Sequence, residues 1–172
     1  GGGICLYIAM TLRDRVSKVV VFAPTCYRLP FVGLHHVLAL DESGLIASIM
    51  TSRWAVRYGL KMQYFNMDKV TETLVAEYAE ALAKPGAMDV LVRMNNDYFS
   101  KEFDDMSQSY RNIQQPLMIV WGDHDGIVPL EYGETLHQLV SNSRLEIIQC
   151  SGHISYQERP ELVNPLLLDF LG

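Results

Sequence analysis

The hydrophobic and polar positions of the chain alternate between short apolar runs and longer helical patterns. The run LMIVW at 117–121 is apolar without interruption, which is typical of a strand buried on both faces of a parallel sheet. The run KVVVFAP at 18–24 has the same character and predicts a second buried strand. A helical pattern and then a third strand pattern follow the first run, carried by Leu136, Leu139 and Val140 and then by Leu145, Ile147 and Ile148. The order of these patterns predicts an α/β fold in which helices flank parallel strands.

The two ends of the chain each predict a helix. Residues 4–12 are apolar on opposite faces, which is typical of a helix buried on all sides. At the other end, Pro160 suits the first turn of a closing helix. Pro165 lies inside that pattern, where it removes an interior donor, so we expect the helix either to start afresh at Asn164 or to be kinked.

Roughly ninety residues separate the strand that ends at Pro24 from the strand that begins at Leu117, which is too long for a loop. One helix is predicted between Asp68, as the N-terminal cap, and the stop Lys84-Pro85-Gly86, from the apolar positions Val70, Leu74, Tyr78 and Leu82. The next is predicted from Val90, Met94 and Tyr98. Upstream, residues 31–65 are rich in large apolar side chains: Phe31, Leu34, Ile46, Ile49, Met50, Trp54, Tyr58, Tyr64 and Phe65. This composition fits both the floor of a helical lid and the interior of a small helical bundle.

Two polar loops follow the predicted strand at 117–121 and the predicted strand that carries Leu145, Ile147 and Ile148. Asp123, His124 and Asp125 come directly after the strand at 117–121, and His153 lies in CSGHISYQERPE after the next strand. Because parallel strands that are adjacent present their carboxyl ends at one edge of the sheet, we expect Asp125 and His153 to meet there.

The motifs WGDHDGIVP and SGHISYQERPE resemble the acid and histidine loops of the α/β-hydrolase superfamily, in which the acid precedes the histidine. The resemblance implies a partial α/β-hydrolase fold with core segments at 1–30 and 116–172 and a helical lid at 31–115. It implies that His153 acts as the base and that Asp125 is the acid. Asp123 is the competing acid, and the family's spacing between Gly122 and Pro129 selects Asp125.

The superfamily carries its nucleophile in a Gly-x-Ser-x-Gly elbow, and no such motif occurs in the chain. The opening Gly1-Gly2-Gly3, followed by a helix and a strand, resembles the sequence just downstream of that elbow; the alternative is a flexible linker. Ser43 and Ser151 each precede a glycine without the rest of the pattern. We therefore expect the nucleophile to lie before Gly1 and the chain by itself to be inactive. Whether that nucleophile is serine or aspartate stays open, as do the oxyanion-hole donors.

Composition narrows the class of ligand. The 172 residues are 49% hydrophobic with a formal charge of −6, which argues against nucleic acids and anionic membranes and favours a small-molecule substrate. Cys5, Cys26 and Cys150 are an odd number without metal-site spacing, which favours reduced thiols and a cytoplasmic location. A thiol nucleophile is disfavoured because neither Cys26 nor Cys150 lies in a glycine-flanked elbow.

The remaining histidines indicate no metal site, and the resemblance to the α/β-hydrolase superfamily implies neither a metal nor an organic cofactor. His35 and His36 are adjacent and would point to different sides of a helix, and His124 is expected to face solvent. By resemblance, the expected reaction is hydrolysis of a small carboxylic ester or related acyl compound through a nucleophile-His-Asp triad. Hydrolysis of a carbon–carbon bond, an aspartate-nucleophile epoxide or haloalkane hydrolase, and a non-catalytic binding protein are the alternatives. The oligomeric state stays open.

Overall fold

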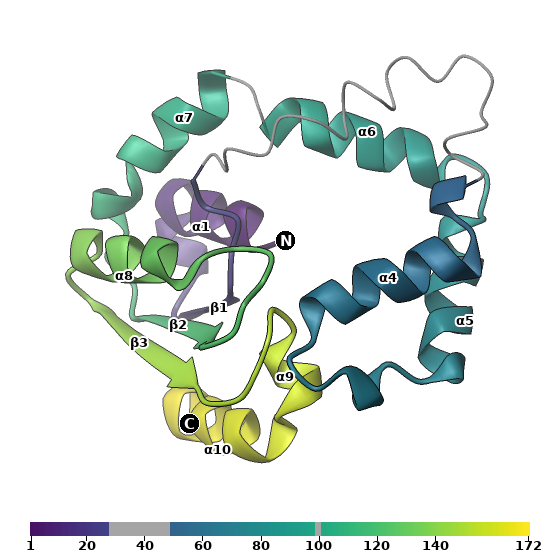
Figure 1. The fold of residues 1–172 in the computed structure, drawn as a ribbon. Helices are drawn as coiled ribbons and strands as arrows, with labels where there is room; N and C mark the ends of the chain where they lie inside the picture. Colours follow the sequence, from purple (N-terminus) through teal and green to yellow (C-terminus); the bar gives the residue numbers. More distant parts are fainter. Residues whose placement is uncertain (28–48, 99–100) are drawn as a thin grey trace.

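The computed structural model describes residues 1–27, 49–98 and 101–172, which form a parallel sheet with helices on both faces and a further group of helices beside it (Figure 1). The strands are β1 (Val19–Phe22), β2 (Leu117–Gly122) and β3 (Ser143–Ile148). The α-helices are α1 (Gly2–Thr11), α4 (Arg53–Gln63), α5 (Glu72–Leu82), α6 (Ala87–Tyr98), α7 (Lys101–Gln108), α8 (Leu130–Leu139), α9 (Ser155–Glu158) and α10 (Pro160–Leu171). Short 3-10 turns occupy η1 (Arg13–Arg15), η2 (Met67–Lys69) and η3 (Tyr110–Asn112).

The sheet has the order β1-β2-β3, and both strand pairs are parallel. Val19 lies opposite Leu117, and Leu117 lies opposite Ser143. All six residues of β2 are buried, as the uninterrupted apolar run predicted. The prediction that the strands of the acid and histidine loops are parallel neighbours is therefore confirmed.

The central strand is apolar throughout because helices cover both faces of the sheet. On one face Leu117, Ile119 and Trp121 join a core cluster with residues of α1 and α8. On the other face Met118 and Val120 pack with Val163 and other residues of α10. Figure 1 shows α1 and α8 on the side of the sheet opposite to α10. Neighbouring residues of β2 thus belong to different cores, so alternation disappears from its sequence.

Strand β1 is less buried than its sequence predicted. Val19 and Val21 are buried, whereas Val20 and Phe22 are only half-buried against the cluster of α10. Within the described residues β1 pairs with β2 alone and forms an edge of the sheet. The prediction of a strand buried on both faces is therefore wrong for β1 in this structure.

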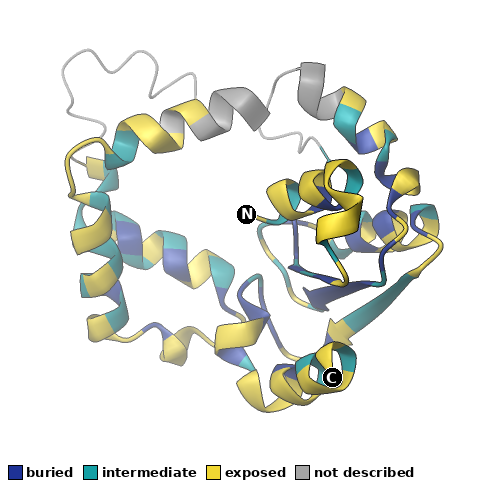
Figure 2. Cartoon of the chain, turned by 180° about the vertical axis from the view of Figure 1, so that it is seen from behind, coloured by how far each residue is buried: buried dark blue, intermediate teal, exposed yellow. Residues whose placement is uncertain are grey.

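Helix α1 buries one face only. Its residues Leu6 and Ala9 are fully buried, but Ile4 is 62% exposed and Tyr7 is 53% exposed. Figure 2 shows α1 with much of its surface exposed. The prediction of a helix buried on all sides is therefore not met in the described part of the molecule.

Among the described residues between β1 and β2, helices α4 and α5 pack on each other through Val56, Leu60 and Val75. The predicted helix at 70–82 is present as α5, but its N-terminal cap is Thr71, whose side chain accepts a hydrogen bond from Leu74 N. The prediction of Asp68 as the cap is wrong, because Asp68 lies in the preceding turn η2. The helix predicted from Val90, Met94 and Tyr98 is present as α6. Several predicted residues lie outside the described ranges: Phe31, Leu34, His35, His36, Ser43 and Ile46.

The closing helix α10 is continuous from Pro160 to Leu171. Pro160 occupies its first turn, as predicted, and Pro165 lies inside it, so a fresh start at Asn164 is excluded. At 12 residues, α10 and α6 are the longest helices described. In the part of the chain that the structure describes, no helix combines the length and the apolar character that crossing a membrane requires.

Candidate active site

Asp125 is positioned by the loop that leaves the carboxyl end of β2. Its Oδ1 accepts hydrogen bonds from the backbone N–H groups of Ile127 at 2.8 Å and Val128 at 2.9 Å. Trp121, the last large side chain of β2, donates its Nε1–H to the carbonyl oxygen of Val128 at 3.0 Å. The Asp125 side chain is completely buried. The loop therefore fixes one carboxylate oxygen with its own backbone and leaves the other to face a neighbour.

That neighbour is His153. Its Nδ1 lies 2.8 Å from Asp125 Oδ2, and its side chain is 23% exposed. Sequence reasoning predicted that these residues meet, and the structure brings them together across 28 positions of the chain. With Nδ1–H donating to the carboxylate, Nε2 becomes the proton-accepting atom of the imidazole, as a general base requires.

The two loops touch each other where the strands end. A Cβ on Gly122 would lie 2.2 Å from the carbonyl oxygen of Gly152 and 2.3 Å from that of Ser151. The N–H of His124 donates to the Ser151 carbonyl oxygen at 3.0 Å. A side chain at position 122 would force the loops apart, so the glycine that ends β2 is required for the approach of Asp125 to His153.

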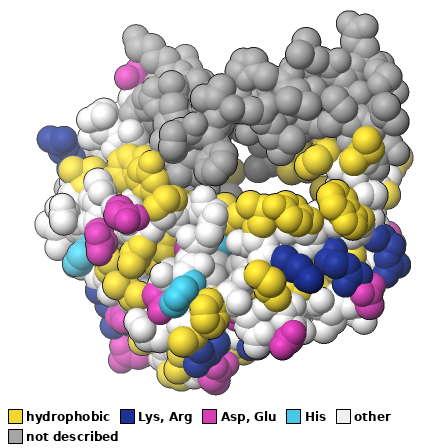
Figure 3. Space-filling model, in the orientation of Figure 1, with side chains coloured by type: hydrophobic (Ala, Val, Ile, Leu, Met, Phe, Trp, Pro, Cys, Tyr) yellow, Lys and Arg dark blue, Asp and Glu magenta, His cyan; other side chains and the backbone are white. Residues whose placement is uncertain are grey.

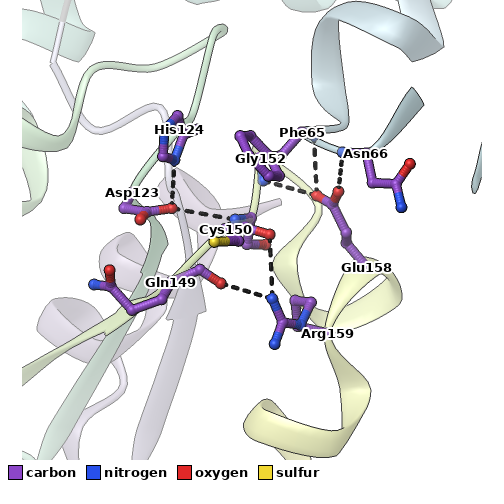
Figure 4. A network of polar contacts seen from close by, with 10 residues as sticks. Phe65, Asn66, Asp123, His124, Gln149, Cys150, Gly152, Glu158 and Arg159 are labelled. Carbon is purple, nitrogen blue, oxygen red and sulfur yellow. Dashed lines mark hydrogen bonds and ion pairs between the residues drawn. The ribbon is translucent and has the colours of Figure 1, made fainter. Parts of the chain in front are cut away.

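Asp123 faces a different partner from Asp125. Its Oδ1 lies 2.8 Å from His124 Nδ1 and accepts a hydrogen bond from Ser151 N at 3.1 Å (Figure 4). Desolvation acts to raise the pKa of Asp123, but hydrogen bonds from the His124 side chain and from the Ser151 and Cys150 backbone outweigh it and hold the pKa below 3.8. Asp123 thus ties the acid loop to the histidine loop, and the His153 contact belongs to Asp125.

His124 lies at the surface, as predicted. Its side chain is 54% exposed, and its ring centroid lies 4.4 Å from that of Phe65. Phe65 follows α4, so this contact joins the acid loop to helices α4–α7, which we call the helical group. The histidine is within hydrogen-bond distance of Asp123, which identifies it as part of the support of the loops.

A second set of contacts holds the histidine loop against residues 63–66, which follow α4. The N–H of His153 donates to the Gln63 carbonyl oxygen at 2.8 Å. The Tyr64 hydroxyl donates to Gln157 Oε1 at 2.7 Å, and burial raises the pKa of Tyr64 to about 12, which keeps that donor protonated. Glu158 receives further N–H donors in this region. We call these contacts the histidine-loop joint: residues 63–66 on one side, and Gly152, His153, Gln157 and Glu158 on the other.

Sequence reasoning missed the histidine-loop joint. Glu158 is included in the sequence analysis only as part of the motif SGHISYQERPE, and no role is assigned to Gln63. The sequence around Glu158, SYQERPE, is polar, so nothing in it indicates that this carboxylate is buried. Gln63 carries no signal either, because its contact with His153 uses its backbone carbonyl oxygen.

Two of the other nucleophile candidates in the described part of the chain, Cys26 and Ser151, are fully buried. Cys26 is fully buried, and desolvation raises the pKa of its thiol to about 12, which disfavours the reactive thiolate. Cys150 is exposed, and Ser151 is fully buried. All three cysteines are free thiols.

Helix α4, whose C-terminal end lies beside this site, carries exposed hydrophobic side chains. Trp54 is 72% exposed and Tyr58 is 61% exposed, and their rings are stacked with centroids 6.1 Å apart. Figure 3 shows hydrophobic side chains at the surface in the region where α4 lies in Figure 1. The carbonyl oxygen of Met62, near the end of α4, lies close to Gly126 of the acid loop. Helix α4 therefore carries exposed apolar side chains and ends beside the Asp125–His153 pair.

Comparison with known proteins identifies the class to which this fold belongs. Two solved hydrolase structures superpose on 99% of the chain: the meta-cleavage product hydrolase CumD from Pseudomonas fluorescens, with a TM-score of 0.76, 20% identity and 61% of that chain covered, and 2-hydroxy-6-oxo-6-phenylhexa-2,4-dienoate hydrolase from Rhodococcus, with a TM-score of 0.77, 17% identity and 60% covered. The structure thus has the α/β-hydrolase fold.

Sequence relatives agree with this fold. A family model described as alpha/beta hydrolase fold matches residues 89–160. An uncharacterized hydrolase of Bacillus subtilis, YugF, is 24% identical over 99% of the chain, and a 2-hydroxy-6-oxononadienedioate/2-hydroxy-6-oxononatrienedioate hydrolase of Klebsiella pneumoniae is 35% identical over all of it. The chain spans 62% and 59% of the length of these two relatives. The chain belongs to the α/β-hydrolase superfamily.

Proposed function

We propose that the protein containing this chain is a hydrolase in which His153 is the general base and Asp125 orients it. The observation that carries the proposal is the 2.8 Å contact between His153 Nδ1 and the buried Asp125 Oδ2. Asp125 holds the imidazole in the tautomer that leaves Nε2 able to accept a proton, and it stabilises the imidazolium that then forms. A buried carboxylate fixed by two backbone donors is well suited to this task.

In this proposal His153 takes the proton of a nucleophile that attacks the substrate and later returns a proton to the leaving group. No residue of the chain is assigned as that nucleophile, because the sequence contains no Gly-x-Ser-x-Gly motif. We therefore expect the 172-residue chain alone to show no hydrolysis above background. Serine and aspartate nucleophiles both remain compatible with the Asp125–His153 pair.

We further propose that the helices α4 to α7 form a lid over this site. In support, α4 presents exposed aromatic side chains, and its end contacts both the acid loop and the histidine loop. An apolar wall beside a catalytic pair suits a small-molecule substrate with a hydrophobic portion.

The test is turnover of short-chain p-nitrophenyl esters by the protein that contains this chain, with His153→Ala and His124→Ala compared as a matched pair. We expect the change at His153 to lower kcat at least about 10³-fold, because the members of such a unit act together. The change at His124, an exposed neighbour, should leave kcat within about threefold. Equal activity of both variants would reject His153 as the base, and ligand binding without turnover in the unmodified protein would favour a non-catalytic binding role.

Carbon–carbon bond hydrolysis is a second candidate, favoured by the relatives. The Klebsiella pneumoniae relative is named for hydrolysis of 2-hydroxy-6-oxononadienedioate, and CumD is named as a meta-cleavage product hydrolase. The same base would serve this reaction, because it too needs proton transfer at a positioned histidine. Comparing kcat/KM for a 2-hydroxy-6-oxo-dienoate with kcat/KM for an ester decides between the two. A ratio above about 100 in either direction, roughly 2.7 kcal/mol of transition-state binding, assigns the substrate class.

A further inference from the structure

Glu158 is an acidic side chain with no exposed surface at the end of α9. Its Oε2 accepts hydrogen bonds from Gly152 N at 2.7 Å and from Phe65 N at 3.2 Å, and its Oε1 accepts one from Asn66 N at 2.5 Å. Figure 4 shows the carboxylate pointing between the Gly152 loop and the residues after α4. Within the described residues, no Lys or Arg side chain forms an ion pair with this carboxylate. Backbone N–H groups therefore take the place of a counter-ion.

The donors come from two parts of the chain that are far apart in sequence. Gly152 immediately precedes His153, whereas Phe65 and Asn66 follow α4. Lys69 Nζ also contacts the carbonyl oxygen of Glu158. One buried side chain thus binds both segments: Glu158 Oε2 accepts hydrogen bonds from Gly152 and Phe65, and Oε1 accepts one from Asn66.

The same two segments are in direct contact beside His153. The N–H of His153 donates to Gln63 O at 2.8 Å, and a Cβ on Gly152 would lie 2.4 Å from that same oxygen. The backbone of His153 is therefore held by residues 63–65. The distance between the histidine loop and this segment depends on the side chains that contact both of them. Glu158 is the side chain that joins both sides.

We propose that Glu158 is a positioning residue for His153: its buried carboxylate locks the histidine loop to the segment after α4 and so fixes the imidazole against Asp125. The inference rests on the proposed function, since a positioning role requires that His153 be catalytic. Its chemical basis is that a carboxylate offers acceptors on both oxygens, whereas an amide offers only one. In Glu158→Gln the amide nitrogen must face at least one backbone N–H, so one of the three donors loses its acceptor.

The experiment uses the protein that contains this chain, with Glu158→Gln, the matched control Glu161→Gln and the base variant His153→Ala. The side chain of Glu161 is 58% exposed and lies three residues after Glu158. Glu161→Gln therefore removes one negative charge as Glu158→Gln does, but from the surface. Kinetics on an ester or dienoate substrate are measured together with backbone hydrogen exchange. If Glu158→Gln does not fold, Glu158→Asp takes its place, because it keeps the charge but is too short to reach both segments.

We expect kcat of Glu158→Gln to fall about 10- to 100-fold, as a displacement of about 1 Å does at a catalytic group. KM should change by less than about threefold, because the loss concerns the chemical step. Exchange should accelerate at the amides of Phe65, Asn66, Gly152 and His153, while amides of β2 stay protected. A residue that stabilised the fold alone would lower the melting temperature without this local pattern and would leave kcat of the folded protein unchanged.

The outcomes separate the inference from the proposed function. If His153→Ala abolishes turnover and Glu158→Gln keeps kcat within threefold of the unmodified protein, the positioning role is overturned and the proposed function stands. If His153→Ala retains turnover, the proposed function fails first. If Glu161→Gln lowers kcat as much as Glu158→Gln, loss of negative charge rather than the buried contact is responsible, and the inference is overturned.

Discussion

The acid loop and the histidine loop end neighbouring strands, yet they are held in place in different ways. In the acid loop, Asp125 is fixed by the amides of Ile127 and Val128, two and three residues further along. In the histidine loop, the N–H of His153 is bonded to Gln63, 90 positions away, and Gly152 is bonded to Glu158, which also holds Phe65. The carboxylate of Asp125 is thus fixed within its own loop, whereas the backbone at Gly152 and His153 is fixed by contacts with the helical group.

This difference teaches how the catalytic pair depends on the rest of the molecule. A loop that satisfies its own polar groups keeps its geometry as long as its strand is in place. A loop whose backbone is bonded to a distant segment keeps its geometry only while that segment is docked. We therefore expect disturbances of the helical group to reach the site through His153 and to leave Asp125 in place.

The largest effect on activity is expected when the contact between Asp125 and His153 is lost. Asp125→Asn should lower kcat about 10⁴-fold, because an amide can hold the histidine in the wrong tautomer. Asp123→Asn is the matched control two residues away, and it should cost less than about tenfold because its partners are His124 and a backbone amide. Steady-state kinetics of both variants decide the assignment, and similar losses would mean that the two aspartates share the role.

A smaller effect is expected where the helical group touches the histidine loop. In Gly152→Ala the new Cβ meets backbone atoms, Gln63 O at 2.4 Å and Phe65 N at 2.9 Å, so the joint must move. We expect a loss of activity of about 10²-fold and a destabilisation of about 1–3 kcal/mol. Gly126→Ala in the acid loop meets one backbone atom, Met62 O, at 3.1 Å, a tight contact that a shift of a few tenths of an ångström relieves, so it should cost less than Gly152→Ala. Denaturant unfolding and kcat test this, and a larger cost for Gly126→Ala would reverse the comparison.

The acid loop can be weakened without touching the catalytic pair. Trp121→Phe removes the Nε1–H donor and leaves the buried carbonyl oxygen of Val128 without it. The expected destabilisation is about 1–3 kcal/mol, and kcat at temperatures below unfolding should change by less than about tenfold. Thermal unfolding followed by kinetics measures both quantities. A collapse of kcat in the folded variant would show that the acid loop is not fixed by its own amides.

The smallest effect concerns pH. The pKa of Asp123 is held below 3.8 in the folded protein, so the unfolded state binds the proton more readily. The stability that Asp123 contributes is therefore fully present above about pH 4 and is lost as the pH falls through the lowered pKa. Unfolding free energies measured from pH 6 downward should fall less steeply in Asp123→Asn than in the unmodified protein. Identical slopes would mean that the contacts of Asp123 add nothing to stability.

The sequence predicts the features that depend on neighbours along the chain. Strand β2, helices α5 and α8, and the meeting of Asp125 with His153 follow from apolar periodicity and from the geometry of parallel strands. The N-terminal cap of α5 was misplaced by three residues, since Asp68 and Thr71 are both good caps and only the turn η2 decides between them. Apolar periodicity alone does not give the exposure of Ile4 and Tyr7 on α1 or the half-buried state of β1, because burial depends on which elements are packed against them.

The histidine-loop joint was beyond sequence reasoning for a related reason. Gln63, Phe65 and Asn66 take part through a backbone carbonyl oxygen and two backbone N–H groups, and every residue type except proline has both. Nothing in the identity of these residues indicates the contact. Glu158 is the one side chain of the joint whose burial is chemically unusual, but two of its three donors, Phe65 and Asn66, lie 93 and 92 positions away.

The use of backbone atoms on one side of the joint has a consequence for which substitutions the protein tolerates. Positions 63, 65 and 66 should keep the joint with many residue types, because replacement leaves the contacting backbone atoms in place; replacing Phe65 also removes its ring contact with His124. Positions 152 and 158 should accept few, because one has no room for a Cβ and the other supplies both carboxylate oxygens. In a library that varies all five positions, functional clones should diversify on the α4 side and stay nearly uniform on the histidine side. Helical segments from relatives could then be exchanged at this boundary without redesigning the histidine loop.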